Sequence, residues 1–170
     1  MIRAATAADS AVLQDIEVAA GAMFATVGLA DVAAHDPFPI AELDAYAAAG
    51  RSWVGVDAAG SVVGYAVADV LDGCGHLEQA SVRPEAQGRG VGRALVDAVT
   101  AWTRDSGYDA VTLTTFTDVA WNAPLYAHLG FRAVAEADLG PELAARRDDE
   151  TRHGLDPGRR VCMRRDVRRS

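Results

Sequence analysis

Residues 76–106 change from a strand pattern to a helix pattern across one glycine-rich turn, and this change constrains the fold more than any other feature. The segment HLEQASV (76–82) has the length and composition of a strand, and Pro84 ends it. Residues 91–106 place apolar side chains on one stripe and polar side chains on the opposite one, which predicts an amphipathic helix. A strand that leads into such a helix is typical of a domain in which helices cover a sheet.

The N-terminal part of the chain begins with a strand pattern over residues 1–5 and continues with two helix patterns. Thr6 and Asp9 resemble a helix start at which Thr6 caps the first N–H groups. Apolar residues at helical spacing predict a first helix over about 7–24. Residues 25–39 have no regular pattern, and a second helix is predicted over 40–50, ending at Gly50.

The remaining patterns complete an alternation of strands and helices. They predict a hairpin of strands over 52–57 and 61–71, a strand over 110–116, a short helix around 121–129, a strand over 131–137, a helix over 141–155 and a last strand over 159–167. This order predicts an α/β domain with a mixed sheet covered on both faces.

Length and charge restrict the class of protein. A chain of 170 residues favours a single domain over 1–170. The net charge of −8 argues against nucleic acid as the main partner. We find no apolar run of about 20 residues for a membrane span and no secretory signal, so we expect a cytoplasmic protein without a membrane partner. Cys74 and Cys162 form no CxxC pair, and we expect two free, buried thiols.

The turn Gln87-Gly-Arg-Gly-Val-Gly-Arg93 predicts an anion-binding site. The first turn of a helix leaves about four N–H groups without a partner, and the helix dipole adds partial positive charge there. Glycines allow the backbone to approach an anion, and Arg89 and Arg93 add full charges. The arrangement fits a pyrophosphate. The alternative is a tight turn in which the glycines only relieve strain.

Spacing excludes two common phosphate motifs. A P-loop requires a lysine after its last glycine, and the chain contains no lysine. A dinucleotide fingerprint requires GxGxxG, but the residue three positions after Gly90 is Arg93.

Two segments together resemble the GCN5-related N-acetyltransferase (GNAT) family. Gln-x-x-Gly-x-Gly at 87–92, after a strand, resembles the acetyl-coenzyme A motif of that family. NAPLYAHLGF (122–131) resembles its second signature, in which a tyrosine precedes Leu-Gly-Phe. The resemblance covers 76–131. It implies the acyl-CoA N-acyltransferase fold, with a mixed, mostly antiparallel sheet that splays between the fourth and fifth strands and has helices on both faces.

The resemblance also implies acetyl-CoA as co-substrate and no metal ion. Its pyrophosphate would be held by the backbone of Gln87, Gly88, Arg89, Gly90, Val91, Gly92 and Arg93. The pantetheine arm would pair with the backbone of Ala80, Ser81 and Val82 as an added strand would. Many family members have an asparagine cofactor ligand seven residues before the tyrosine, where this chain has Val119. Asn122 is a candidate cofactor contact and also a candidate helix cap.

Two residues are candidates for proton transfer. Tyr126 matches the tyrosine of the family, which donates a proton to the leaving thiolate; the alternative is a core tyrosine. Glu78 is our candidate base, acting directly or through water; the alternative is a carboxylate paired with an arginine. His76 is a second candidate base, because its ordinary pKa suits the task.

The acceptor is less constrained than the donor. We expect transfer of an acetyl group to a primary amine, most simply a small molecule bound by a monomer or a homodimer. The resemblance implies acceptor contacts in residues 24–39, where Phe24, His35 and Phe38 are candidates. Residues 138–157 are a further candidate segment, but we favour a solvated helix face for its acidic run. The alternatives are a protein or peptide N-acetyltransferase and a regulatory domain that binds acetyl-CoA without turnover.

Overall fold

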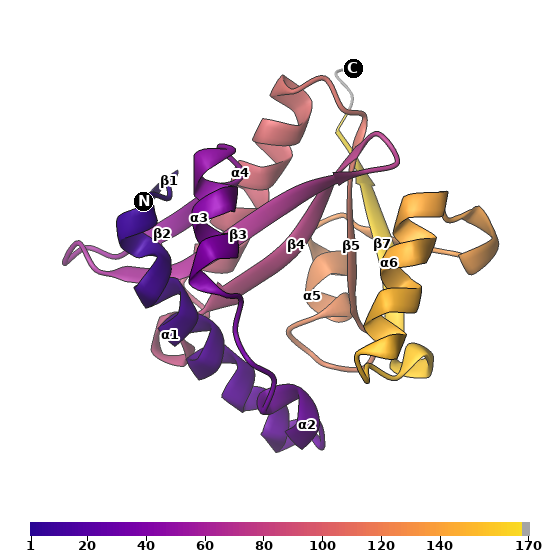
Figure 1. The fold of residues 1–170 in the computed structure, drawn as a ribbon, viewed down its shortest axis with the longest axis horizontal. Coiled ribbons are helices and arrows are strands. Elements are labelled where there is room, and N and C mark those ends of the chain that lie inside the picture. The colour runs from indigo at the N-terminus through magenta and orange to yellow at the C-terminus, as the bar shows by residue number, and fades with distance from the viewer. Residues whose placement is uncertain (168–170) are drawn as a thin grey trace. The chain divides into compact units, whose positions relative to one another are not determined.

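The computed structural model describes residues 1–167 of the chain. Its strands form a seven-stranded mixed sheet in the order β1-β2-β3-β4-β5-β7-β6. Figure 1 labels the helices and strands, which follow in this order: β1 (Ile2–Ala4), α1 (Ser10–Gly21), α2 (Ala30–Ala33), α3 (Ile40–Ala48), β2 (Ser52–Val56), β3 (Val62–Leu71), β4 (Cys74–Val82), α4 (Val91–Asp105), β5 (Ala110–Phe116), α5 (Ala123–His128), β6 (Arg132–Val134), α6 (Pro141–Arg152) and β7 (Arg160–Asp166).

The predicted α/β class and order of elements are confirmed, with two local differences. The segment 25–39, predicted to be irregular, contains the end of a 3₁₀ stretch (Ala22–Val27) and the short helix α2. The strand predicted over 131–137 is only β6, because the chain enters a 3₁₀ turn at Glu136–Asp138. Gly50 has a φ of 69°, so the predicted left-handed end of the second helix is confirmed.

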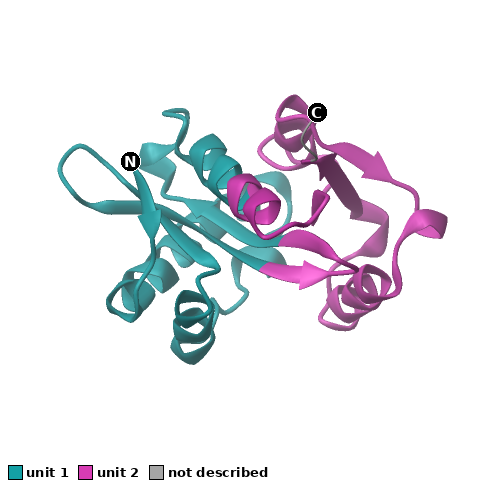
Figure 2. Ribbon diagram, turned by 90° about the horizontal axis from the view of Figure 1, so that it is seen from above, with its two compact units in different colours: residues 1–68, 77–99 teal, residues 69–76, 100–170 magenta. Residues whose placement is uncertain are grey.

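The chain divides into two compact units, coloured teal and magenta in Figure 2. Unit 1 comprises Met1–Ala68 and Leu77–Val99, and unit 2 comprises Asp69–His76 and Thr100–Ser170. Strand β4 therefore contributes its first residues to unit 2 and the others to unit 1. The expectation of one domain over 1–170 stays a prediction.

Unit 1 has helices on both faces of its strands. On one face, α1 and α3 share a core with β2 and β3; its fully buried members include Leu13, Ile16, Leu43, Val54, Tyr65 and Val67. On the other face, the first residue of α4 lies against β3. A Cβ placed on Gly64 would come 3.1 Å from Cγ1 of Val91. Because successive strand residues point to opposite faces, the side chain of Tyr65 points toward α1.

Helix α1 and its flanking 3₁₀ turns form one apolar stretch, Ala7–Val27, which has the length and composition of a membrane span. The expectation that the chain contains no such stretch is therefore wrong. Length and composition alone are weak indicators, because the core helix of a globular domain passes the same test. Leu13 and Ile16 of this helix are buried in the core of unit 1, as expected of a helix packed on a sheet.

Unit 2 is built on β5. Strand β4 runs parallel to β5, with Gly75 opposite Val111 and His76 opposite Thr112. On its other edge, β5 pairs with β7 in antiparallel register over 110–116. Alternation places Thr114 and Thr115 on opposite faces. The expected splay between β4 and β5 involves residues of different units and stays a prediction.

The two faces of β5 carry different helices. Thr114 Oγ1 donates to the Glu150 carboxylate of α6, whereas Thr115 Oγ1 donates to Oδ1 of Asn122, just before α5, at 2.9 Å. The hairpin between β3 and β4 caps α6, because the Asp72 carboxylate accepts the backbone N–H groups of Glu142 at 3.0 Å and Leu143 at 2.9 Å. Helix α6 is therefore held to the β3–β4 hairpin near its first residues and to β5 near its last residues.

Candidate active site

The glycine turn opens α4 as the sequence predicts. Gly88 and Gly90 have φ values of 72° and 82°, in the region that favours glycine. A Cβ on either residue would meet nothing within 4 Å, so backbone conformation rather than lack of space requires glycine. Ala94 N–H donates to Gly90 O at 3.0 Å and makes the first helical bond. The N–H groups of Val91, Gly92 and Arg93 precede that bond and have no carbonyl of the helix to pair with.

The charged residues of the turn are open to an anion. Arg89 is exposed and forms no hydrogen bond or ion pair with the residues described. The side chain of Arg93 is 69% exposed, and its Nε lies 3.8 Å from Asp97 Oδ2, a loose pair that an anion can displace. Free helical N–H groups beside two exposed guanidinium groups fit a pyrophosphate.

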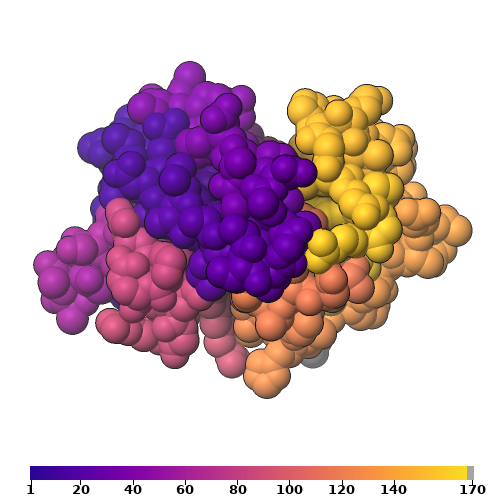
Figure 3. Space-filling view, turned by 90° about the horizontal axis from the view of Figure 1, so that it is seen from below, coloured from indigo at the N-terminus to yellow at the C-terminus, as the bar shows by residue number. Residues whose placement is uncertain are grey.

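Gln87 fixes the turn to its surroundings within unit 1. Its Nε2 donates to Val82 O, at the end of β4, at 3.3 Å and contacts Met23 Sδ at 3.1 Å. Figure 3 shows the turn, in pink, on the surface beside the indigo N-terminal segment. The turn, the end of β4 and the 3₁₀ stretch after α1 therefore lie together.

The last residues of β4 continue this site. Ser81 is buried and its Oγ accepts from Gln79 Nε2 at 2.9 Å, whereas Ala80 and Val82 are half-buried. Arg83 N–H donates to Val63 O at 2.8 Å, so β4 remains attached to β3 at its end. Glu78 is half-buried and lies two residues before Ala80 on β4.

His76 is less suited than Glu78 to act as a base. It is 1% exposed, and its Nδ1 lies 2.9 Å from Thr112 Oγ1. Burial lowers the pKa of His76 to about 4; the positive charge of Arg146 acts in the same direction, and Asp69 opposes it. A buried imidazole with so low a pKa remains neutral at physiological pH and takes up a proton poorly.

Tyr126 is positioned by the way its helix ends. Phe131 N–H donates to Tyr126 O and Gly130 N–H donates to Ala127 O, both at 3.0 Å, and Gly130 has a φ of 89°. These two bonds define a Schellman motif, in which the residue after the glycine packs on the residue five positions earlier. The rings of Tyr126 and Phe131 meet edge to face, with centroids 5.7 Å apart. The spacing of Tyr126 to Leu129-Gly130-Phe131 thus has a structural cause.

The environment of Tyr126 keeps its phenol protonated. Its side chain is half-buried, and its hydroxyl makes no hydrogen bond with any residue in the described part of the chain. Burial raises the pKa of Tyr126 to about 12, and the positive charge of Arg160 opposes this shift. The phenol is therefore neutral at physiological pH and has a proton to donate.

Asn122 occupies the predicted cap position of α5, but its side chain makes no capping hydrogen bond. Its Oδ1 accepts from Thr115 Oγ1 at 2.9 Å and from Phe116 N–H at 3.4 Å, and thus ties the start of α5 to β5. Its role as a cofactor contact stays a prediction.

The candidate acceptor residues lie in unit 1. Phe24 and Phe38 are half-buried and His35 is exposed. Sequence patterns did not reveal the contacts of Phe38: its N–H donates to Glu17 Oε2 at 3.1 Å, and its C=O accepts from Gln14 Nε2 at 2.8 Å. In the acidic run of 148–150, Asp148 and Asp149 are exposed to solvent. Glu150 instead forms an ion pair, in which its carboxylate lies 3.1 Å from Arg160.

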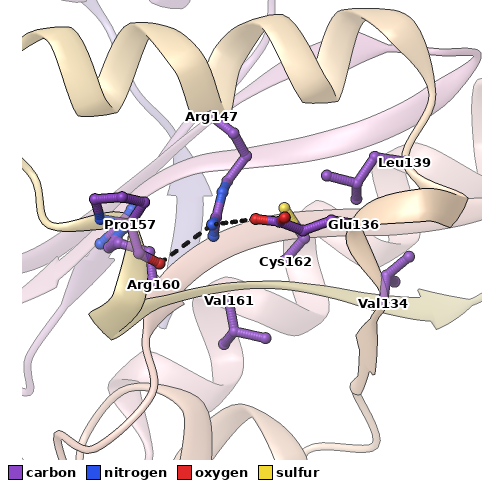
Figure 4. Close-up of a pocket in the computed structure, with 8 residues that line it drawn as sticks. All are labelled: Val134, Glu136, Leu139, Arg147, Pro157, Arg160, Val161 and Cys162. Atoms are coloured by element: carbon purple, nitrogen blue, oxygen red, sulfur yellow. Dashed lines mark hydrogen bonds and ion pairs between the residues drawn. The ribbon is translucent and has the colours of Figure 1, made fainter.

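A hollow in unit 2 lies beside α6, with about 320 Å³ of space that includes open solvent. Figure 4 shows Arg147 reaching from α6 to Glu136 Oε1 at 3.2 Å and to Pro157 O at 3.3 Å. The Arg147 side chain is 9% exposed, so these contacts fasten two loops to the helix. The other residues that line the hollow are Val134, Leu139, Arg160, Val161 and Cys162.

Both cysteines are free and buried, as predicted. Within residues 1–167, no group of three or more His, Cys, Asp or Glu side chains is arranged to hold a metal ion.

The chain thus has the two expected signatures in the expected order: a glycine turn that opens α4, then strand β5, then helix α5 with Tyr126. Residues 22–131, well over half of the chain, match the acetyltransferase (GNAT) family. The chain belongs to this family, and the resemblance noted in its sequence is confirmed.

One curated relative is the aminoglycoside N(6')-acetyltransferase type 1 of Stenotrophomonas maltophilia. It is 64% identical over 33 residues, which are 19% of this chain and 22% of that enzyme. So short a match covers only part of either protein.

Solved structures share the fold. An acetyltransferase of the GNAT family from Staphylococcus aureus Mu50 has a TM-score of 0.74 at 16% identity, covering 99% of each chain. The N-acetylglutamate synthase of Neisseria gonorrhoeae, complexed with coenzyme A and N-acetyl-glutamate, has a TM-score of 0.74 at 19% identity. There the match covers 99% of this chain and 35% of the gonococcal one. At these identities the likeness establishes the fold alone.

Proposed function

We propose that this protein is an N-acetyltransferase that moves the acetyl group of acetyl-CoA to a primary amine of a small molecule. The observation that carries the proposal is the turn at 87–93. Its two left-handed glycines, free first-turn N–H groups and exposed arginines form an anion site directly after a strand. Membership of the family and a structural neighbour crystallised with coenzyme A support this choice of ligand.

The residues of the turn and of β4 would bind different parts of acetyl-CoA. The backbone N–H groups of Gln87–Arg93, with Arg89 and Arg93, would hold the pyrophosphate. The backbone of 80–82 would pair with the pantetheine arm. Acetyl-CoA supplies the thioester, whose C–S bond breaks as the C–N bond to the amine forms. No metal ion is needed for this transfer.

Glu78 is the proposed base. An alkylammonium group has a pKa of about 10.4, so at neutral pH a proton must be removed before the nitrogen can attack. Glu78 would take that proton, directly or through water. Its half-buried position on β4, two residues before the segment 80–82, supports this role. The burial and low pKa of His76 make it the weaker candidate.

Tyr126 is the proposed acid. The thiolate that leaves coenzyme A needs a proton, and the neutral phenol of Tyr126 can donate one. The hydroxyl is not engaged elsewhere in the described residues, and the Schellman motif fixes the ring on Phe131.

A small amine is preferred as the acceptor over a protein or peptide. The 33-residue match to an aminoglycoside acetyltransferase supports a small-molecule acceptor. The net charge of −8 favours a cationic one and disfavours nucleic acid. We further propose that the protein acts in the cytoplasm, as a monomer or a homodimer.

The test is a screen of amines in which thiol release from acetyl-CoA is followed. We expect release with at least one class of small amines and a loss of rate in Glu78→Gln. If the protein binds acetyl-CoA but releases no thiol with any small amine, two alternatives remain. Release with peptides would then indicate a peptide acetyltransferase, and no release with any amine would indicate a regulatory domain.

A further inference from the structure

Glu17 of α1 is a half-buried carboxylate held by neutral donors. Its Oε2 accepts from the hydroxyl of Tyr65 at 2.7 Å and from the N–H of Phe38 at 3.1 Å. Tyr65 is fully buried in the core of unit 1, so it fixes the position of the carboxylate. The second oxygen of Glu17 makes no hydrogen bond with the residues that the structure describes.

No positive charge compensates this carboxylate. Among residues 1–167, Glu17 forms no ion pair, whereas several other partly buried acids, among them Asp9, Asp69 and Glu150, each pair with an arginine. Burial raises the pKa of Glu17, and the hydrogen bonds from Tyr65 and Phe38 oppose this. A partly buried charge without a partner costs stability, and such groups are concentrated at functional sites.

The segment beside Glu17 is held in place by α1. In 37–39, Pro37 and Pro39 have no N–H, so Phe38 carries the one backbone donor. Glu17 takes this donor, and Gln14, one turn earlier on α1, donates to the carbonyl of Phe38 at 2.8 Å. The Phe38 ring in turn packs edge to face on Tyr46, with centroids 6.0 Å apart. The Glu17 carboxylate and the backbone of Phe38 therefore hold each other in place, and the Phe38 ring is fixed on Tyr46.

The neighbours of Gly64 show on which face of unit 1 Glu17 lies. Tyr65 follows Gly64, whose missing side chain would point at Val91 of α4 and lie 3.0 Å from Ser81 O. Tyr65 and Glu17 are thus on the face opposite α4, above the part of β3 that runs beside the end of β4. The 3₁₀ stretch that follows α1 reaches the glycine turn through Met23 and Gln87. Figure 3 shows the N-terminal segments, indigo to purple, as a broad exposed surface next to that turn.

We propose that Glu17 is an acceptor-binding residue that pairs with a second cationic group of the amine, one that does not react. This inference rests on the proposed function and specifies its acceptor class as diamines and polyamines. The paired group is assigned as a non-reacting one, because Glu78 is already the proposed base for the reacting nitrogen. A half-buried carboxylate without an ion-pair partner among the described residues is suited to bind an ammonium group.

The experiment compares a linear monoamine with the diamine of the same chain length. For the wild type we expect a larger kcat/KM for the diamine, with the difference mainly in KM. In Glu17→Gln the amide oxygen can still accept from Tyr65 and Phe38, so the fold is retained, and thermal unfolding checks this. The ratio of kcat/KM between the two amines should fall about tenfold, as for loss of one charge-assisted hydrogen bond.

Asp15→Asn is the matched control, because Asp15 is an exposed carboxylate of the same helix and the change in net charge is identical. The control should leave the ratio unchanged. An equal ratio in Glu17→Gln and in the wild type would overturn the inference while turnover of amines upheld the proposed function. An equal fall in both variants would show that net charge alone attracts the diamine and would also overturn it. If no amine releases thiol in the wild type, the proposed function fails and this inference fails with it.

Discussion

The hydroxyl of Tyr126 can be removed with little disturbance of packing, since it makes no hydrogen bond in the described part of the chain and the ring stays against Phe131. Tyr126→Phe should change the free energy of unfolding by less than about 0.5 kcal/mol. Turnover should fall about 100-fold, which is typical for the loss of a general acid. Steady-state kinetics of thiol release and urea unfolding measure the two effects.

Tyr108→Phe is the control for this variant, because Tyr108 is also half-buried beside an aromatic residue, Trp102, at a ring distance of 6.1 Å. Its turnover should match the wild type. Since the pKa of Tyr126 is about 12, deprotonation of this phenol should not lower the rate below about pH 11. Full turnover in Tyr126→Phe would remove the acid from the mechanism.

The ion pair of Arg3 and Asp9 makes the free energy of unfolding depend on pH. Two bonds of 2.9 Å join the guanidinium and the carboxylate, and this pairing lowers the pKa of Asp9 from its ordinary value of 3.8 to about 2. A lowered pKa in the folded state contributes stability above about pH 4, which is lost as the pH falls toward 2. Asp9→Asn should therefore cost about 1–2 kcal/mol at pH 7, allowing for the exposure of Arg3.

Urea unfolding of the wild type and of Asp9→Asn at several pH values tests this prediction. The two midpoints should differ at pH 7 and converge as the pH falls below about 2, where the carboxyl is protonated in both the folded and the unfolded chain. A difference that stays constant over this range would show that hydrogen bonding rather than charge accounts for the pair.

Residues whose roles depend on their neighbours in the sequence could be predicted. Residues whose partners lie far away in the sequence could not. The glycines of the turn and the spacing of Tyr126 to Phe131 reflect rules that act within one turn of chain. Glu17 carries no such signal, because its partner Tyr65 is 48 residues away and nothing in either neighbourhood indicates the contact. The side chain of Asn122 was predicted to cap α5, but a threonine of β5 offers it a better donor.

At the scale of elements, the start of α4 is the part most sensitive to a single substitution. Gly90→Ala forces a residue with a Cβ into a φ of 82°, at a cost of about 1–2 kcal/mol. The turn should relax from this conformation and lose its alignment of N–H groups, so the KM for acetyl-CoA should rise about tenfold. Steady-state kinetics at saturating amine measure this change.

Gly107→Ala is the control that separates backbone strain from a loss of affinity for acetyl-CoA. Gly107 follows the other end of α4, with a φ of 83° and open space around it. It should lose a similar amount of stability with an unchanged KM for acetyl-CoA. Equal KM changes in both variants would mean that α4 as a whole, and not the turn, determines the affinity.

Periodicity predicted most helices and strands because their apolar faces are buried, as the core shared by α1, α3, β2 and β3 shows. It missed α2, which is four residues long and contains no buried residue, so no apolar face marks it. It made β6 one residue too long at its start and three too long at its end, where the 3₁₀ turn at Glu136–Asp138 has no distinct composition. The attachment of α6 through Asp72 depends on a contact 70 residues apart in sequence.

At the scale of the whole molecule, the proposed functional residues are distributed over the two units. The turn at 87–93, the end of β4, Glu78 and Glu17 belong to unit 1, and Tyr126 belongs to unit 2. The match to the GNAT family, over 22–131, includes residues of both units. The binding of acetyl-CoA and the protonation of the leaving thiolate are thus assigned to different parts of the chain.

The most direct test of the central claim is a calorimetric titration of the wild-type protein with acetyl-CoA. We predict one site per chain with a Kd on the order of 1–100 µM, competition by free coenzyme A, and weaker binding at high salt because arginines hold the pyrophosphate. Absence of binding at these concentrations would contradict the assignment of the turn at 87–93 to acetyl-CoA.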